Sequence, residues 1–395
     1  MEIKEEYTVA SLFSGIGGLD LGFEWEGFDL VWACDNDKTA AGSYPLNFDT
    51  PLERADLHDL PSGAVPDADV IIGGPPCQSF SLVGRRDSDD PRGDLVFKFA
   101  DVIEEKRPRG FVMENVYGMS TSRVDGVRLP EHLKSRFEEA GYHVTLAKLN
   151  ARDYLVPQRR KRIIMMGCLG SRVSVPDGAR FAEECHGIDI FDYDDGARAA
   201  LGDLGRCTEE KGARVSYSEE AQPSEFAQIM RGECGPAEST GEEGVSLHEM
   251  PRMSETDQRL VSHIPPGGNY MDVPDEAATG RILKFKETGG RTTTYGRLHP
   301  DEPSYTINTY FRRPNVGCNF HYGRERLITP REAMRFQSIP DRFEIQYTAQ
   351  DDRNALIGNA VPPLLAQALA WSLRKALDDP ARPREEGQQA EMFAT

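Results

Sequence analysis

The first 170 residues alternate short apolar runs with segments in which apolar residues recur at helical spacing. The helical spacing is clearest directly after the first apolar run, through Leu19, Leu21, Phe23 and Trp25. Each apolar run is short enough for one buried strand. Strands are predicted at residues 7–13, 28–34, 70–73, 110–114, 144–149 and 162–168. Such alternation predicts an α/β fold with a mostly parallel sheet between helices.

The pattern changes beyond Gly170. Residues up to about Gly296 are polar, acidic and weakly periodic, which predicts a second, smaller and irregular domain or a large insertion. One helix is expected there, beginning near Ser254 with Asp257 three residues later. Regular patterning returns at Arg297, with helices predicted over 330–336 and 362–377. The polar residues 379–395 are expected to form a flexible tail.

Seven cysteines are scattered without CxxC spacing, which argues against a disulfide framework and a structural zinc site. The chain begins with charged residues and contains no stretch of about 18 apolar residues, so neither a signal peptide nor a membrane span is predicted. We therefore expect a cytoplasmic protein with reduced thiols, no metal site and no membrane partner.

A net charge of −19 is unusual for a protein that binds nucleic acid, because basic residues normally dominate such proteins. One hypothesis is adaptation to a halophilic, high-salt cytoplasm. At about 1 M salt the screening length falls to about 3 Å, so distant repulsion vanishes while close contacts by arginines in a cleft survive. The alternative is an ordinary acidic surface on a protein that never meets DNA.

A glycine-rich turn, Ser14-Gly-Ile-Gly-Gly18, follows the first predicted strand, and Asp35 follows the second. Glycines at such a turn let a ligand approach the backbone closely, and an acid after the next strand can bind ribose hydroxyls. The spacing is not GxGxxG, so it favours S-adenosylmethionine over a dinucleotide. Alternatively, the glycines serve packing only. Asp56 follows the next short strand and could bond an adenine amino group, or be an ordinary turn residue.

Cys77 follows Gly74-Pro-Pro76 at the end of a buried strand, where an open α/β sheet presents its ligand crevice. This position suits a nucleophile, although a lone cysteine is more often an inert buried thiol. Glu114 closes another strand at the same edge and could donate a proton near Cys77. The aperiodic residues 78–94 predict a long loop beside them.

Four basic residues occur in the five-residue run Gln158-Arg-Arg-Lys-Arg162. The run enters a strand, so Arg160 and Arg162 share one face. Pointed inward they would hold an anion or a base carbonyl, whereas pointed outward they would form a solvated edge.

An ordered set of motifs resembles that of the DNA cytosine-C5 methyltransferases. Any one of these motifs is weak evidence, but their order is that of the family. The resemblance covers about residues 7–168 and 297–376. The motifs are Phe13-Ser-Gly-Ile-Gly-Gly-Leu19, Gly74-Pro-Pro-Cys-Gln-Ser-Phe-Ser81, Glu114-Asn-Val116, Gln158-x-Arg160-x-Arg162, the block from Arg324 to Asp341, and Gly358-Asn-Ala-Val-Pro362.

The resemblance implies a Rossmann-like class I S-adenosylmethionine-dependent methyltransferase with an added target-recognition domain. Residues 1–169 and 297–378 would form one discontinuous catalytic domain, and residues 170–296 would form the target-recognition domain. The product of the cofactor would be S-adenosylhomocysteine. The cofactor would be bound by Phe13, Gly15, Gly17, Gly18, Leu19, Asp35, Asp56, Pro76, Asn359 and Val361.

For catalysis, the resemblance implies that Cys77 adds to C6 of a flipped-out cytosine and that Glu114 stabilises N3. Arg162, with Arg160 nearby, would bind the cytosine O2 or its phosphate, a bidentate task that lysine performs poorly. The cytosine would have to be flipped out of the duplex, and residues 78–94 would close over it as a lid. The residues expected to contact DNA are Gln78, Ser81, Arg85 and Arg86, and a basic patch of Arg281, Lys284, Lys286 and Arg291 could add to them.

Two other functions remain open at the level of sequence. A relative with the same chemistry could methylate transfer RNA, although a long unmatched middle segment favours sequence-specific double-stranded DNA. A non-catalytic DNA-binding regulator is disfavoured by the intact set of Cys77, Glu114 and Arg162. We expect a monomer from a restriction-modification system, with a cognate restriction endonuclease as a candidate partner.

Overall fold

The computed structural model describes residues 6–76, 94–237, 244–346 and 348–378. Its contacts divide the chain into two compact units. Unit 1 comprises Met1–Tyr154, Lys161–Phe181 and Pro363–Thr395, and unit 2 comprises Leu155–Arg160 and Ala182–Pro362. The flexible tail predicted for residues 379–395 lies outside the described residues.

Unit 1 is built on one seven-stranded sheet in the order β3-β2-β1-β4-β5-β10-β8. The first five strands are parallel, while β10 runs antiparallel to both of its neighbours. The predicted mostly parallel α/β sheet is therefore confirmed. The strands are β1 (Thr8–Leu12), β2 (Asp29–Asp35), β3 (Leu52–Arg54), β4 (Val70–Gly73), β5 (Gly110–Val116), β8 (His143–Asn150) and β10 (Lys161–Cys168).

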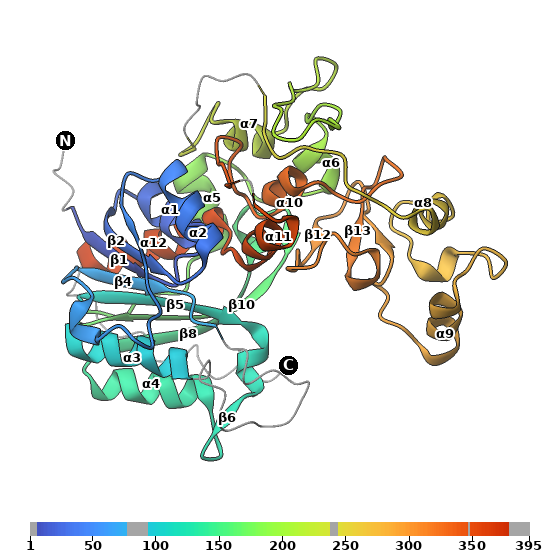
Figure 1. The fold of residues 1–395 in the computed structure, drawn as a ribbon. Coiled ribbons are helices and arrows are strands. Elements are labelled where there is room, and N and C mark those ends of the chain that lie inside the picture. Colours follow the sequence, from blue (N-terminus) through green and yellow to red (C-terminus); the bar gives the residue numbers. More distant parts are fainter. Residues whose placement is uncertain (1–5, 77–93, 238–243, 347, 379–395) are drawn as a thin grey trace. The chain divides into compact units, whose positions relative to one another are not determined.

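Helices cover both faces of this sheet (Figure 1). Helices α3 (Asp94–Lys106) and α4 (Leu129–Glu139) lie on one face, where their apolar residues join a core cluster with β1, β4 and β5. On the other face, α1 (Gly18–Trp25) packs on α12 (Pro363–Asp378). A Cβ at Gly22 would lie 2.4 Å from Cβ of Ala366, so glycine is what lets these two helices approach so closely.

The remaining elements of unit 1 are short. Helix α2 begins after Asp37, whose side chain caps it by accepting from the backbone N–H groups of Thr39 and Ala40. Helix α5 leaves the unit and continues into unit 2. These elements are α2 (Lys38–Ser43), β6 (Arg123–Val124), β7 (Val127–Arg128) and α5 (Gly178–His186).

Unit 2 consists mostly of short elements, as the weak periodicity of its sequence predicts. The helix predicted near Ser254 is α8, and the Ser254 hydroxyl caps it by accepting from the backbone N–H of Asp257. The elements are α6 (Ala197–Leu201), α7 (Glu225–Arg231), α8 (Glu255–Ser262), α9 (Gly280–Thr288), α10 (Pro330–Phe336), α11 (Gln350–Asn359), β9 (Gln158–Arg159), β11 (Gly296–Arg297), β12 (Ser304–Tyr305) and β13 (Cys318–Phe320).

The units differ in extent from the domains expected from the sequence. Residues 297–362, expected in the returning catalytic part, cluster with unit 2. The physical reason is packing across residue 296: β11 pairs with β13, and one apolar cluster joins Leu260 to Phe320. Which residues recognise the DNA target stays a prediction.

One described segment, Gln350–Asp378, is long and apolar enough to cross a membrane by length and composition alone. Of its most apolar window, 89% is buried inside the protein, as in the core helix of a globular fold.

Candidate active site

The glycine-rich turn after β1 has a left-handed backbone. Phe13, Gly15 and Gly17 have φ angles of 58°, 55° and 86°. The Asp35 carboxylate at the end of β2 accepts a 2.8 Å hydrogen bond from the backbone N–H of Gly15 and another from that of Asp37. Four predicted cofactor residues thus lie at the carboxyl edge of the sheet.

The two glycines of this turn differ in what surrounds them. A Cβ at Gly15 would meet nothing within 4 Å, so the turn has open space on that side. A Cβ at Gly17 would lie 2.3 Å from the Phe48 ring, which stacks on Tyr44. Gly15 thus leaves room for a ligand, whereas Gly17 serves close packing. Of the two alternatives for these glycines, close packing applies at Gly17, whereas a ligand-binding role at Gly15 stays a prediction.

A network of buried polar side chains stabilises the glycine-rich turn. The Asp20 carboxylate accepts hydrogen bonds from the hydroxyls of Ser11 at 2.6 Å and Tyr44 at 2.8 Å. The hydroxyl of Ser14, which lies in the glycine-rich turn, donates a hydrogen bond to the Ser11 hydroxyl. Burial raises the pKa of Asp20 to about 6. The sequence prediction missed this network, although an aspartate facing the core in the first turn of a helix was a signal for it.

The acids predicted to bind the cofactor lie at the ends of neighbouring strands. Burial raises the pKa of Asp35, an effect that the N–H groups of Asp37 and Gly15 oppose. Asn36 bridges toward Asp56, with 3.4 Å between its Nδ2 and the carboxylate. The other Asp56 oxygen accepts from the backbone N–H of His58. A carboxylate oxygen can accept further hydrogen bonds, so both acids can still receive hydroxyl or amino donors.

Of the other predicted cofactor residues in unit 1, Gly18 and Leu19 are buried in α1, while Pro76 is half-buried. Asn359 and Val361 belong to unit 2. Asn359 is the last residue of α11 and is exposed, whereas Val361 is buried.

Glu114 forms a buried ion pair with Arg162. The Arg162 Nε lies 2.5 Å from Glu114 Oε1, and each side chain is about one-tenth exposed. Arg162 also donates to the Lys161 carbonyl. In the sheet register Glu114 pairs with Ile164, so Arg162 lies two residues away on the adjacent strand and on the same face. Two predicted catalytic residues thus meet, and Arg162 is not a solvated edge residue.

The other Glu114 oxygen faces the turn that leads to Cys77. A Cβ at Gly74 would lie 3.3 Å from Glu114 Oε2, so a larger residue there would press on the carboxylate. Asn115, the next residue of β5, donates a 2.9 Å buried hydrogen bond to the Pro75 carbonyl. The sequence prediction quoted Asn115 as part of a motif but gave it no role. In the structure, the hydrogen bond from Asn115 to the Pro75 carbonyl stabilises this turn.

Arg160 is fully buried in unit 2, among main-chain carbonyls. Its guanidinium donates to the carbonyls of Ile307 at 3.1 Å, Gly358 at 2.9 Å and Ala360 at 2.9 Å. These contacts make Arg160 a structural residue that holds the segment containing Asn359. Its predicted direct contact with substrate stays a prediction.

Several predicted residues lie outside the described residues. They are the nucleophile Cys77 and the expected DNA contacts Gln78, Ser81, Arg85 and Arg86. Six other cysteines are described, and all are free thiols. Burial raises the pKa of four of these thiols, those of Cys34, Cys207, Cys234 and Cys318. A raised pKa disfavours the reactive thiolate at these four positions. The assignment of Cys77 as the nucleophile stays a prediction.

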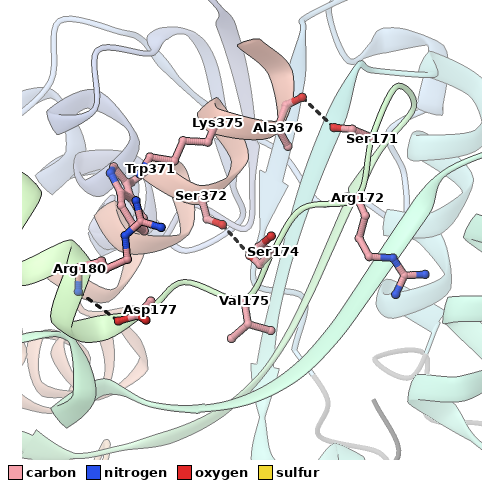
Figure 2. A pocket seen from close by; sticks show the side chains of 10 residues that line it. All are labelled: Ser171, Arg172, Ser174, Val175, Asp177, Arg180, Trp371, Ser372, Lys375 and Ala376. Carbon is pink, nitrogen blue, oxygen red and sulfur yellow. Dashed lines mark hydrogen bonds between the residues drawn. The ribbon is translucent and has the colours of Figure 1, made fainter. Parts of the chain in front are cut away.

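Unit 1 also contains a small cavity of about 110 Å³ between α12 and residues 171–180 (Figure 2). The Ser372 hydroxyl donates to the Ser174 carbonyl across it, and the Lys375 ammonium lies 3.6 Å from the centre of the Trp371 ring. Arg172 points away from that ring. None of the predicted site residues lines this cavity.

The sequence of the chain is similar to those of known methyltransferases. A family model described as C-5 cytosine-specific DNA methylase matches residues 7–375. Type II methyltransferase M.NgoPII of Neisseria gonorrhoeae is 32% identical over 385 residues, which cover 94% of this chain and 96% of the relative. Type II methyltransferase M.MthTI of Methanothermobacter thermautotrophicus is 31% identical over 379 residues, covering 94% and 98%.

Solved structures agree on the fold. A putative DNA modification methyltransferase from an Escherichia coli prophage gives a TM-score of 0.69 at 24% identity, covering 94% of this chain and 99% of that one. The Dnmt2 methyltransferase of Schizosaccharomyces pombe gives a TM-score of 0.56 at 16% identity, covering 95% and 100%. These similarities show a shared fold.

Proposed function

The chain belongs to the family of C-5 cytosine-specific DNA methylases, and from that premise we propose that it methylates a flipped-out cytosine in a specific duplex sequence through a covalent Cys77 adduct. The observation that carries this proposal is the buried Glu114–Arg162 pair, whose second carboxylate oxygen faces the turn leading to Cys77.

The reaction follows from the weak nucleophilicity of cytosine C5. The Cys77 thiolate adds to C6, which makes the ring an enamine whose C5 can attack a methyl group. Glu114 hydrogen-bonds or protonates N3, and so relieves the charge that develops on the ring. Arg162 orients the Glu114 carboxylate and binds the cytosine O2 or its phosphate. Loss of the C5 proton, to water or an unidentified base, and elimination of the thiolate complete the cycle.

The proposed cofactor is S-adenosylmethionine, which when bound supplies an electrophilic methyl group on sulfur. The open space beside Gly15 fits a ligand that approaches the backbone closely. Asp35 is proposed to accept from the ribose hydroxyls, and Asp56 from the adenine amino group. Asn359 and Val361 are proposed to complete the pocket, with Arg160 fixing the segment that carries them.

The finer biological setting also belongs to the proposal. The relatives named as Type II methyltransferases support a role in a restriction-modification system, with a cognate restriction endonuclease as partner. We propose a monomer that acts in the cytoplasm on double-stranded DNA.

Tritium transfer tests the proposed substrate. S-adenosylmethionine labelled in its methyl group is incubated with the protein and either mixed-sequence duplex DNA or total transfer RNA. Label is expected in the DNA and absent from the RNA. Label in transfer RNA alone would favour the RNA methyltransferase, and label in neither would favour the non-catalytic regulator. Mapping the methylated positions in labelled DNA then gives the target sequence.

A further inference from the structure

Asp20 is a buried carboxylate that has no cationic partner in the structure. Its exposure is 0%, and its two oxygens accept hydrogen bonds from the neutral hydroxyls of Ser11 at 2.6 Å and Tyr44 at 2.8 Å. Among the residues that the structure describes, no arginine, lysine or histidine is paired with it. The charged groups that act on it most strongly are two further acids, Glu24 and Asp35. Buried charges are normally paired, so this carboxylate lacks a countercharge.

The two hydroxyl groups that bond this carboxylate also contact the glycine-rich turn. The Ser11 hydroxyl accepts a 2.9 Å hydrogen bond from Ser14, whose carbonyl accepts from the backbone N–H of Gly17 at 2.8 Å. The Tyr44 ring would lie 3.0 Å from a Cβ at Gly17. The same turn has open space beside Gly15, where the cofactor is proposed to approach. The buried carboxylate is therefore connected to the proposed cofactor site through single intervening side chains.

The charge of Asp20 changes within an accessible pH range. Burial raises its pKa to about 6, an effect that the hydroxyls of Ser11 and Tyr44 oppose. Tyr44 itself stays neutral there, because burial and the nearby carboxylate raise its pKa far above the ordinary value. Asp20 is therefore mostly neutral at pH 5 and mostly ionised at pH 7.5.

We propose that the ionised Asp20 carboxylate makes the cofactor site favour S-adenosylmethionine over its product S-adenosylhomocysteine. This inference rests on the proposed function and its cofactor. The substrate carries a positive sulfonium, whereas the sulfur of the product is neutral. Attraction between opposite charges is strong where little water intervenes, so a carboxylate buried next to the turn can act without touching the ligand. The charge of Asp20 would thus help the site to retain the substrate and release the product.

Two unreactive ligands test this proposal by calorimetry. Sinefungin has a positively charged ammonium group in place of the sulfonium, and S-adenosylhomocysteine is neutral at that position. Dissociation constants of both ligands are measured from pH 5 to pH 8, and their ratio is taken at each pH. The ligands share their adenosine and amino-acid parts, so the contributions of groups proposed to contact those parts, such as Asp35 and Asp56, largely cancel in the ratio.

For the wild type, the preference for sinefungin is expected to rise about fivefold between pH 5 and pH 7.5, as Asp20 ionises. Asp20→Asn should keep the low preference throughout. Tyr44→Phe removes a donor that stabilises the ionised carboxylate, so the rise should move to higher pH. The matched control is Glu24→Gln, which removes an exposed acid of the same helix and should retain the rise.

A preference that does not change with pH in the wild type would overturn the proposal. So would an undiminished rise in Asp20→Asn, or loss of the rise in Glu24→Gln. If circular dichroism shows that Asp20→Asn is unfolded, Tyr44→Phe decides, and a midpoint at the wild-type pH would contradict the role of Asp20. Failure of the proposed function gives a different result, because the wild type would then bind neither ligand at any pH.

Discussion

The Glu114–Arg162 pair concentrates the proposed chemistry in two side chains. A guanidinium nitrogen 2.5 Å from the carboxylate fixes its direction, and burial of both groups limits the screening of this ion pair by water. Leaving either charge without its partner would cost several kcal/mol, so the pair has to be perturbed by small changes.

Glu114→Gln is the change that keeps the shape of the side chain and removes its acid. We expect single-turnover methyl transfer to fall about 10²- to 10⁴-fold, the range of general acid–base catalysis. Binding of S-adenosylhomocysteine, measured by calorimetry, should stay within about twofold. Arg162→Lys is the companion variant, since it keeps the charge and loses the planar donor. Unimpaired transfer by Glu114→Gln would remove Glu114 from the reaction.

The raised pKa of Asp20 predicts that its contribution to the free energy of unfolding depends on pH. Its pKa is raised to about 6, so the folded state favours its protonated form more than the unfolded state does. The contribution of Asp20 to stability is then fully present below about pH 4 and is lost as the pH rises through about 6, by about 3 kcal/mol. Asp20→Asn should remove this loss. Urea unfolding of both proteins at pH 4.5 and pH 7 measures it, and identical pH dependence of the two proteins would contradict the assignment.

At the scale of elements, the sequence predicted the strands well because they are buried and bounded by clear turns. The strand expected at 70–73 is β4, and the helix expected at 330–336 is α10. The expected range of the second domain did not coincide with unit 2. Patterning cannot reveal that Phe320 packs in one cluster with Leu260, because that contact joins residues 60 positions apart.

The site was predicted only in part, because the sequence pattern places the strand ends but does not reveal contacts between residues far apart in the chain. Strand ends meet at one edge of a parallel sheet, so Gly15, Asp35 and Glu114 could be placed there from the sequence. The positions of Asn115 and Arg160 depend on which carbonyls they reach, and no periodicity encodes that.

The two glycines of the β1–α1 turn should respond differently to the same substitution. Gly17→Ala brings a Cβ against the Phe48 ring, so the free energy of unfolding should fall by about 1–3 kcal/mol. Gly15→Ala has open space and bears only backbone strain of about 1–2 kcal/mol, but its Cβ should enter the ligand space. Calorimetry with S-adenosylhomocysteine should therefore show at least a 10-fold weaker affinity for Gly15→Ala. Unchanged affinity would place the cofactor elsewhere.

At the scale of the whole molecule, the net charge of −19 opposes DNA binding at low salt. If the acidic surface is an adaptation to high salt, methyl transfer to duplex DNA should persist as salt rises toward about 1 M, where screening is nearly complete. Initial rates of tritium transfer from 0.05 to 2 M KCl measure this. A sharp optimum at low salt would remove the halophilic hypothesis and leave the methyltransferase assignment intact.

The proposed mechanism requires a covalent bond between the Cys77 sulfur and C6 of cytosine. Closing the cycle requires the C5 substituent to leave as a cation, which hydrogen can do and fluorine cannot. Incubation with S-adenosylmethionine and a duplex in which 5-fluorocytosine replaces cytosine should therefore trap a stable protein–DNA adduct. Peptide mass spectrometry should place that adduct on Cys77, and Cys77→Ala should form none. An adduct on another residue, or its absence when the wild-type protein methylates ordinary duplex DNA, would contradict the mechanism.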